Sequence, residues 1–360
     1  MTIRVGVIRG NGIGPEITEA TLHVLESTGL DFQWVPIAIG DEGVEQYGHP
    51  LPQESVKALK EVKIAIKAPL LVDKFKGRLY CEHEDGSVGI YPSLNNAIRR
   101  ELGLFVCPRP IKGIPGISGP YEKLDVHIMR EITEDVYSGI EHMIGEEAAE
   151  CVKLTTRKAA VKVAEYAFDY ARKNHRKKVT CVHKANAVSM ADGLFLKCFR
   201  EVAVKNPDIP SDDYMVDAAA YYLAKCPEKF DVVVASNQYG DILSDLAAGL
   251  IGSLGLAPGA NVGDDGRIVV EASHGAAPDI AGKGIANPIA LILSGVLLLR
   301  ELGKEEEAQS VEEAVFQVLR EGRTLTPDLG GNASTMDVAR AIGERVAGQT
   351  ERAAGKEERL

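Results

Sequence analysis

The 360-residue chain has no closely spaced pair of cysteines and no excess of positive charge. Its six cysteines are scattered without a Cys-x-x-Cys pair, so neither a structural zinc site nor a disulfide framework is expected. The 41 basic residues are outnumbered by 52 acidic residues, giving a formal charge of −11. This balance argues against a protein that binds nucleic acid or an anionic membrane.

The chain also lacks a hydrophobic run long enough for a membrane span. The most apolar stretch, 285–299, is too short and is interrupted by Pro288 and Gly295. A strand is predicted from residue 3 onward, so no signal peptide is expected. Together with the predicted reduced thiols, these features indicate a cytoplasmic protein without a membrane or nucleic-acid partner.

Hydrophobic residues make up 45% of the chain, and its length indicates one large domain or two intimately joined domains. Predicted strands and helices alternate, which is typical of an α/β protein. Short β-branched runs predict strands at 3–8, 31–37, 62–67, 104–107, 126–130, 178–183, 232–234 and 268–271. Helices are predicted up to about residue 27 and over 53–60, 93–102, 152–175, 191–204, 217–223, 289–302 and 305–321. A hairpin is predicted over 79–91, and loops over 113–120 and 255–266.

The stretch 230–255 combines a strand, a turn and a helix with two carboxylates. Residues 237–240 are turn formers, and the helix after them is predicted to hold Asp241 and Asp245 in its first turn. Residues four apart lie on one helix face, so both carboxylates should point the same way. They would supply half of a site for a hard cation such as Mg²⁺ or Mn²⁺. The alternative is an acidic pair that stabilises the helix dipole.

Basic, hydroxyl and amide side chains gather in the middle of the sequence. They are Ser93, Asn95, Arg99, Arg109, Arg130 and Tyr137. Three arginines at helix or strand ends of an acidic protein suggest an anion with several carboxylates, although any one of them alone is more typical of a surface salt bridge. Lys184 follows a predicted strand and is either an acid–base group or a solvated lysine.

The glycine-rich segment 10–16 lies between the first strand and the first helix, as a phosphate-binding turn does. Its spacing is not G-x-G-x-x-G, so a tight turn that requires glycine is the simpler interpretation.

Over nearly its whole length the chain resembles the β-decarboxylating dehydrogenases, the family of isocitrate, 3-isopropylmalate and homoisocitrate dehydrogenases. The matching segments are 10–16, 130–137, 183–186, 237–245, 256–261, 274–279 and 328–331. The sequence Ser93-Leu-Asn95 followed by Arg99 is similar to the isocitrate branch, in which that serine and asparagine meet the extra carboxylate of the substrate.

The resemblance implies an α/β fold of the isopropylmalate dehydrogenase type, not a Rossmann fold. Two α/β domains would surround a central cleft, and a clasp would form a dimer. Residues 1–100 and 250–360 would form the large domain on the cofactor side. Residues 101–249 would form the small domain with the dimer interface and the clasp. Because the active sites of this family are shared, a homodimer is expected.

The resemblance also implies roles for the site residues. Arg99, Arg109 and Arg130 would bind the carboxylates of a small tricarboxylate-type substrate, with Ser93 and Asn95 on its variable arm. Asp241 and Asp245 would hold Mg²⁺ or Mn²⁺, with Asp217 supplied by the second subunit. Lys184, also from that subunit, would take the hydroxyl proton, and Tyr137 would protonate the enol carbon.

The expected cofactor is NAD. The NADP-specific bacterial members of the family have Lys-Tyr where this chain has Asp279-Ile280. An aspartate would repel a 2′-phosphate and accept a hydrogen bond from a free 2′-hydroxyl. The residues that the resemblance assigns to cofactor binding are Asn186, His274, Gly275, Ala277, Asp279, Ile280 and Asn287.

Some residues depart from the family pattern around the pocket for the variable arm. They are Arg9, Asn11, Leu71, Val72 and Ile132, together with the hairpin 79–91, which lengthens a usually short loop. Within this hairpin region Lys76, Arg78 and His83 would either serve a dianionic arm or be solvated loop residues.

The first hypothesis for function is therefore NAD-dependent oxidative decarboxylation of isocitrate to 2-oxoglutarate and CO₂. The alternative is the same chemistry on homoisocitrate, 3-isopropylmalate or a phosphonate analogue. A third hypothesis is a non-catalytic regulatory subunit, which would have lost site residues. The presence of Tyr137, Lys184, Asp217, Asp241 and Asp245 argues against it.

Overall fold

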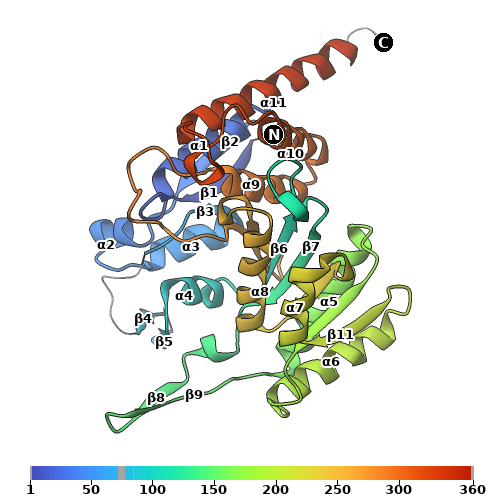
Figure 1. The fold of residues 1–360 in the computed structure, drawn as a ribbon. Coiled ribbons are helices and arrows are strands. Elements are labelled where there is room, and N and C mark those ends of the chain that lie inside the picture. The colour runs from blue at the N-terminus through green and yellow to red at the C-terminus, as the bar shows by residue number, and fades with distance from the viewer. Residues whose placement is uncertain (1, 72–77, 84, 358–360) are drawn as a thin grey trace.

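The structure is a computed structural model that describes residues 2–71, 78–83 and 85–357. Within these residues ten strands form one mixed sheet in the order β11-β10-β12-β7-β6-β13-β14-β3-β1-β2 (Figure 1). These strands are β1 (Ile3–Ile8), β2 (Phe32–Pro36), β3 (Ile64–Lys67), β6 (Leu104–Lys112), β7 (Asp125–Glu131), β10 (Val179–His183), β11 (Ser211–Met215), β12 (Val232–Ala235), β13 (Pro258–Gly263) and β14 (Ile268–Ala272).

Helices and two hairpins surround this sheet. The helices are α1 (Gly14–Glu26), α2 (Asp41–Tyr47), α3 (Gln53–Val62), α4 (Leu94–Glu101), α5 (Arg157–Lys173), α6 (Ala191–Lys205), α7 (Val216–Lys225), α8 (Asn237–Leu250), α9 (Ile289–Glu301), α10 (Glu305–Glu321) and α11 (Thr335–Glu357). The hairpins pair β4 (Leu79–Glu82) with β5 (Val88–Tyr91), and β8 (Glu141–Ile144) with β9 (Ala148–Cys151).

The sheet consists of two parallel halves that run in opposite directions. Strands β2, β1, β3 and β14 are parallel in one half, and β7, β12, β10 and β11 in the other. Antiparallel pairing of β6 and β13 joins the halves. Ligands bind parallel sheets at the carboxyl ends of the strands. Most of the predicted substrate, metal and proton-transfer residues lie at or beyond the carboxyl ends of the strands in the second half, β7, β12, β10 and β11. Most of the predicted cofactor residues follow β14, which belongs to the first half.

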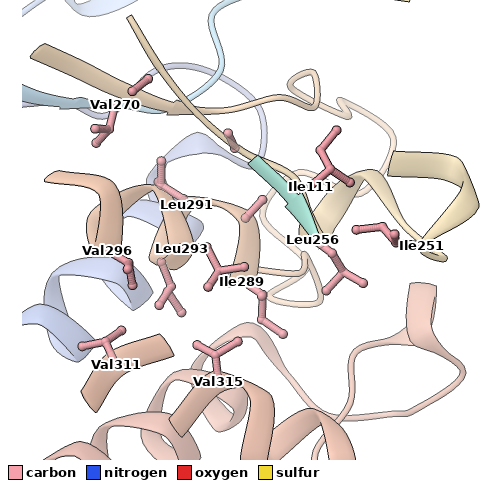
Figure 2. Packing of buried hydrophobic residues seen from close by; sticks show 14 of the residues in the cluster. Ile111, Ile251, Leu256, Val270, Ile289, Leu291, Leu293, Val296, Val311 and Val315 are labelled. Carbon is pink, nitrogen blue, oxygen red and sulfur yellow. The ribbon is translucent and has the colours of Figure 1, made fainter. Parts of the chain in front are cut away.

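Helix α9 is the centre of the largest core. Ten of its thirteen residues are buried, and it packs against β13, β14, α1 and α10. Figure 2 shows its side chains between Val270 of β14 and Val311 and Val315 of α10. A helix that is apolar all round belongs in a protein interior. Among the described residues, no helix is long and apolar enough to cross a membrane.

The structure confirms most of the predicted strands and helices, but the segments 152–175 and 255–266 differ from their predictions. The helix predicted over 152–175 begins only at Arg157, where Thr156 Oγ1 accepts a hydrogen bond from the main chain of Ala159 over 3.2 Å. The residues before it extend into the β8–β9 hairpin, which the sequence did not predict. The loop predicted over 255–266 contains β13, because its turn-forming residues pair with β14 and β6 on either side. Helices α2 and α11 and strand β11 were not predicted.

The predicted hairpin over 79–91 is confirmed as β4–β5, with Glu84 of its turn outside the described residues. Its turn residue His83 lies 2.6 Å from Glu101 Oε1, and Tyr91 OH donates to the same oxygen over 2.5 Å. Arg78 Nη2 donates to the main-chain oxygens of Gly139 (2.8 Å) and Glu141 (3.2 Å). Arg78 and His83 therefore contact protein groups near both hairpins. Lys76 and Val72 lie outside the described residues.

Candidate active site

The connection between β12 and α8 differs from the prediction. Residues 237–240 were predicted to form a turn, but α8 begins at Asn237, so Asp241 and Asp245 lie beyond its first turn. An acidic pair that stabilises the first turn of this helix is therefore excluded. The cause is tertiary contact. Asn237 is fully buried, and Gln238 N donates to Asp135 Oδ2 over 3.0 Å, which pairs an amide at the start of the helix.

Arg130 packs directly against this part of α8. Its Nε and Nη2 donate to Asn237 Oδ1 over 3.0 and 2.7 Å. A Cβ added to Gly240 would lie 2.8 Å from Arg130 Cβ and Cγ. Glycine is therefore required at this position so that the helix can approach the arginine.

The two carboxylates converge, as the i, i+4 spacing predicted, and they converge on arginines. Arg109 Nη1 lies 3.3 Å from Asp241 Oδ1 and 3.5 Å from Asp245 Oδ1. Arg130 Nη1 forms an ion pair with Asp241, and Tyr137 OH donates to Asp241 Oδ2 over 3.3 Å. Arg109 comes from β6, Arg130 from β7, and Tyr137 from the short 3₁₀ helix Val136–Ser138. Three other predicted site residues therefore meet at Asp241.

The charges in this cluster act on one another. Burial, and then the positive charges of Arg109 and Arg99, lower the pKa of Arg130 to about 10. Burial raises the pKa of Asp245, and the Asp241 carboxylate adds to the rise. Three guanidinium groups thus lie within electrostatic range of each other beside two carboxylates. An anion with several carboxylates would stabilise the three guanidinium groups, and a cation would stabilise the two aspartate carboxylates.

Arg99 is positioned by a separate buried group that sequence reasoning missed. Its Nε donates to Asn261 Oδ1 (3.1 Å) and its Nη2 to Glu271 Oε1 (3.3 Å), while Lys67 Nζ lies 2.5 Å from Glu271 Oε2. Burial alone would raise the pKa of Glu271, but Lys67 and Arg99 lower it well below its usual range. The signal was present in the sequence, because Lys67 and Glu271 are charged residues within short apolar strands.

The start of α4 carries the predicted residues for the variable arm. Ser93 is the N-cap, as predicted, and its Oγ accepts from Asn96 N over 3.2 Å. Asn96 Nδ2 donates to the main-chain oxygen of Tyr137 over 2.9 Å. Among the described residues, Asn95 Oδ1 is a buried oxygen without a hydrogen-bond partner. This helix start is therefore polar, next to the Tyr137 segment, and incompletely paired.

Lys184 and Asp217 lie apart from this cluster. They follow β10 and β11, and Lys184 Nζ donates to Asp217 Oδ1 over 2.6 Å. This hydrogen bond lowers the pKa of Asp217. In the described part of the chain, neither residue forms a hydrogen bond or ion pair with Asp241 or Asp245. Among the described residues, no hydrogen bond joins the two predicted proton-transfer residues, Tyr137 and Lys184.

The donor set on α8 fits a hard cation only in part. The side chains of Asp241 and Asp245 are 34% and 51% exposed, and carboxylate oxygens suit Mg²⁺ or Mn²⁺. Among the described residues, however, no group of three or more His, Cys, Asp or Glu side chains is arranged to hold a metal. One chain thus offers two ligands, and further ligands must come from elsewhere.

Most of the predicted cofactor residues lie in one segment after β14. His274 Nδ1 lies 3.0 Å from the main-chain oxygen of Gly275, burial lowers the pKa of the ring, and Nε2 is buried without a partner among the described residues. Ala277 adopts a positive φ of 38°. Asp279 is exposed and Ile280 is half-buried. A neutral imidazole with an unpaired nitrogen is suited to a polar ligand atom.

The glycine loop contacts this segment directly. Ile13 N donates to Ala276 O over 2.9 Å, and a Cβ on Gly12, whose φ is +61°, would lie 2.0 Å from the same oxygen. This contact agrees with the interpretation of a tight turn that requires glycine.

The two remaining predicted cofactor residues lie elsewhere. Asn287 donates to Asp328 Oδ2 (3.0 Å), whereas Asn186 lies in the turn beside Lys184, in the other half of the sheet.

Two of the family departures, Ile132 and Asn11, have local explanations. Ile132 is fully buried in an apolar cluster. Asn11 Nδ2 donates to Asp41 Oδ2 over 2.6 Å, and Asn11 Oδ1 accepts from Leu71 N over 3.1 Å. Asn11 therefore joins the segments after β1, β2 and β3.

Comparison with known proteins identifies consistent similarities. A family model described as isocitrate/isopropylmalate dehydrogenase matches residues 4–346. The chain is 42% identical over 333 residues to an Arabidopsis thaliana protein named NAD isocitrate dehydrogenase catalytic subunit 5, mitochondrial, covering 92% of this chain and 86% of the relative. It is 44% identical over 339 residues to an Archaeoglobus fulgidus protein named 3-isopropylmalate dehydrogenase, covering 94% and 98%. The crystal structure of isocitrate dehydrogenase from Methylococcus capsulatus matches with a TM-score of 0.87 and 42% identity, covering 96% and 99%.

We predict that Glu271→Gln lowers the free energy of unfolding by about 3–5 kcal/mol at pH 7, because it leaves the buried Lys67 without its charged partner. The depressed pKa of Glu271 in the folded state means that its contribution is present above about pH 4.5 and is lost as the pH falls further. The difference between wild type and variant should therefore shrink by about 1.4 kcal/mol per pH unit below that value. Urea unfolding at pH 7, 4 and 3.5 measures this difference in the free energy of unfolding.

The control is Glu201→Gln, which removes an exposed partner of Arg157 and should change little. A Glu271→Gln variant as stable as wild type at pH 7, or a difference independent of pH, would contradict the assignment of Glu271 as an ionised buried partner.

Proposed function

Because the chain belongs to the isocitrate/isopropylmalate dehydrogenase family of β-decarboxylating dehydrogenases, we propose that its reaction is the NAD-dependent oxidative decarboxylation of isocitrate to 2-oxoglutarate and CO₂. The observation that carries this proposal is the meeting of Arg109, Arg130 and Tyr137 at Asp241, with the polar start of α4 beside the Tyr137 segment.

The three carboxylates of isocitrate are matched by the arginines of the cluster and by the polar start of α4. Arg99, Arg109 and Arg130 are suited to bind the carboxylates of the malate core. Ser93 and Asn95 would face the third carboxylate at the start of a helix, where the backbone amides favour negative charge. An apolar arm would leave these polar groups unpaired, at a cost of about 1–3 kcal/mol each.

Proton transfer is assigned to two residues. Tyr137, whose OH lies 3.3 Å from Asp241 Oδ2, would give a proton to the carbon that loses CO₂. Lys184 would take the proton of the substrate hydroxyl. Asp241 and Asp245, with Asp217, would hold Mg²⁺ or Mn²⁺, which when bound polarises the oxygen on the reacting carbon and stabilises the negative charge left by CO₂ loss.

Among the described residues, Lys184 and Asp217 pair with each other and form no hydrogen bond or ion pair with Asp241, which supports a homodimer with shared sites in which a second copy supplies both residues. The β8–β9 hairpin supports the same arrangement. It extends away from the body of the molecule (Figure 1), and Met143 and Ile144 on it are 60% and 56% exposed. An isolated two-stranded hairpin is only marginally stable, so a second copy would stabilise it as the clasp. We propose that this clasp belongs to a small domain of residues 101–249, with 1–100 and 250–360 forming the large domain.

The same chemistry on a different substrate arm is the second candidate. It is supported by the 44% identity to a protein named 3-isopropylmalate dehydrogenase and by a cavity of about 410 Å³ between the two hairpins. Arg78, Ile90 and Pro92 line this cavity, so a homologous or phosphonate arm would find both a cation and apolar contacts there.

We expect isocitrate to be the best substrate in a panel with homoisocitrate, 3-isopropylmalate and a phosphonate analogue, assayed with NAD and Mg²⁺. Its kcat/KM should exceed that of 3-isopropylmalate about 10-fold or more, as follows from one unpaired polar group. Excess chelator should abolish turnover.

Ser93→Asp should remove activity on isocitrate by charge repulsion, whereas the control Ser93→Thr keeps the hydroxyl and should retain it. A kcat/KM on isopropylmalate equal to that on isocitrate would refute the carboxylate arm.

The cofactor preference is a separate prediction. We expect a higher kcat/KM with NAD than with NADP, because the exposed Asp279 would repel a 2′-phosphate and Ile280 offers it no hydrogen bond. The double variant Asp279→Lys, Ile280→Tyr should shift the preference towards NADP. Steady-state assays with both cofactors decide, and a wild-type preference for NADP would overturn the prediction.

Shared sites are tested by mixing two inactive variants. Lys184→Met and Asp241→Asn each remove one part of the site. A heterodimer of the two regains one complete site and should recover up to about half of the wild-type activity per dimer, since sites act as units of all their residues. Tagged heterodimers purified from co-expression provide the measurement. Heterodimers that form but stay inactive would show that each site is built from one chain.

A further inference from the structure

Lys153 lies between the segment that carries Tyr137 and the turn that carries Lys184. Its Nζ is 2.6 Å from Asp135 Oδ1, 3.5 Å from Asp192 Oδ1 and 3.3 Å from Ser236 Oγ. Asp135 and Asp192 are each only 2% exposed, and the lysine side chain is 14% exposed. The ammonium thus donates to Asp135 and Ser236 and forms an ion pair with Asp192. A buried ammonium shared by two buried carboxylates cannot be removed without leaving both uncompensated.

Asp135 fixes the main chain that leads to Tyr137. It has φ 72° and ψ −157°, a region that is costly for any residue except glycine. Its Oδ1 accepts from Val136 N over 2.8 Å, and its Oδ2 accepts from Gln238 N over 3.0 Å. These bonds attach the Tyr137 segment to the first turn of α8, the helix that carries Asp241. The ion pair with Lys153 offsets the backbone strain.

Asp192 fixes the turn that carries Lys184. Its Oδ2 accepts from the main-chain nitrogen of Lys184 over 2.6 Å, and its own N donates to Val188 O over 3.1 Å. Asp192 belongs to the first turn of α6, so this contact joins the turn after β10 to a rigid helix. Lys153 therefore contacts, through one carboxylate each, the two segments on which Tyr137 and Lys184 depend.

We propose that Lys153 is a positioning residue that fixes the Tyr137 segment and the Lys184 turn of one chain at the same time, and so couples the geometry of two active sites. This inference rests on the proposed function, in which Tyr137 serves the site of its own chain and Lys184 serves the site of the second copy. Loss of one lysine then disturbs both sites of a dimer. The ammonium touches neither substrate nor cofactor residues, so substrate affinity should change little.

The structural half of the proposal is tested without substrate. Hydrogen exchange of the full-length Lys153→Met protein should be faster than wild type in both 133–140 and 184–192. The matched control is Lys158→Met, an exposed lysine on α5, which should leave both segments unchanged. Lys153→Arg keeps the positive charge on a wider head group, so it should fold even where Lys153→Met does not. Its hydrogen exchange rate in the same two segments should increase less than that of Lys153→Met. A change in only one segment, or in neither, would refute the coupling.

The functional half is tested in heterodimers. In a tagged dimer of one wild-type and one Lys153→Met chain, one site contains the altered Tyr137 segment and the other contains the altered Lys184 turn. If both are displaced, each site should lose about 10-fold or more in kcat with KM for isocitrate nearly unchanged, so the heterodimer should retain roughly a tenth of wild-type activity. If Lys153 serves one segment only, one site stays intact and about half of the activity remains, which would overturn the proposal. Wild-type activity on the substrate panel tests the proposed function independently, and the exchange experiment stands whatever that assay gives.

Discussion

Arg130 contacts the first two turns of α8 through Asn237 and Asp241, and this contact sets the geometry of the whole candidate site. It joins strand β7 to the helix that carries two of the three predicted metal ligands, Asp241 and Asp245. Gly240 permits the close approach, because any side chain there would collide with the arginine. Arg109 from β6 contacts the same carboxylates from the neighbouring strand. The positions of Asp241 and Asp245 therefore follow from the sheet, not from the helix alone.

The same ion pairs balance the charges of the candidate site. Buried arginines are costly when unpaired, and here the partly exposed Asp241 and Asp245 provide the counter-charge for Arg109 and Arg130. An anion that bound the arginines alone would leave the carboxylates uncompensated, and a cation that bound the carboxylates alone would leave the arginines uncompensated. The proposed anionic substrate and divalent cation would therefore bind together. Farther along the sheet, the carboxylate of Glu271 likewise provides the counter-charge for Lys67 and Arg99.

The sequence predicted the strands and helices whose residues agree with their local propensity. Helix α10 has the bounds expected, and Ser93 caps α4 as expected. The errors arose where tertiary contacts outweigh propensity. Asn237 and Gly240 are turn formers, but buried contacts with Arg130 and Asp135 place them in a helix. Strand β13 contains proline, glycine and asparagine, yet it pairs on both sides in the middle of the sheet. Contacts between residues such as Arg99 and Glu271, 172 positions apart, have no local signal that specifies the partner.

Asp135 shows why stability and site geometry are not separable in this molecule. Its backbone conformation costs of order 1–3 kcal/mol, and the amides of Val136 and Gln238 and the ammonium of Lys153 offset that cost. The interactions that make the conformation tolerable are the ones that direct the chain into Tyr137. A residue with unstrained geometry at this position would relieve the strain but would change the path of the following segment. The Lys153 ammonium also forms an ion pair with Asp192, so the constraint extends to the turn of Lys184. A single buried ammonium thus stabilises two segments at the carboxyl ends of β7 and β10, where parallel strands place the residues that contact ligands.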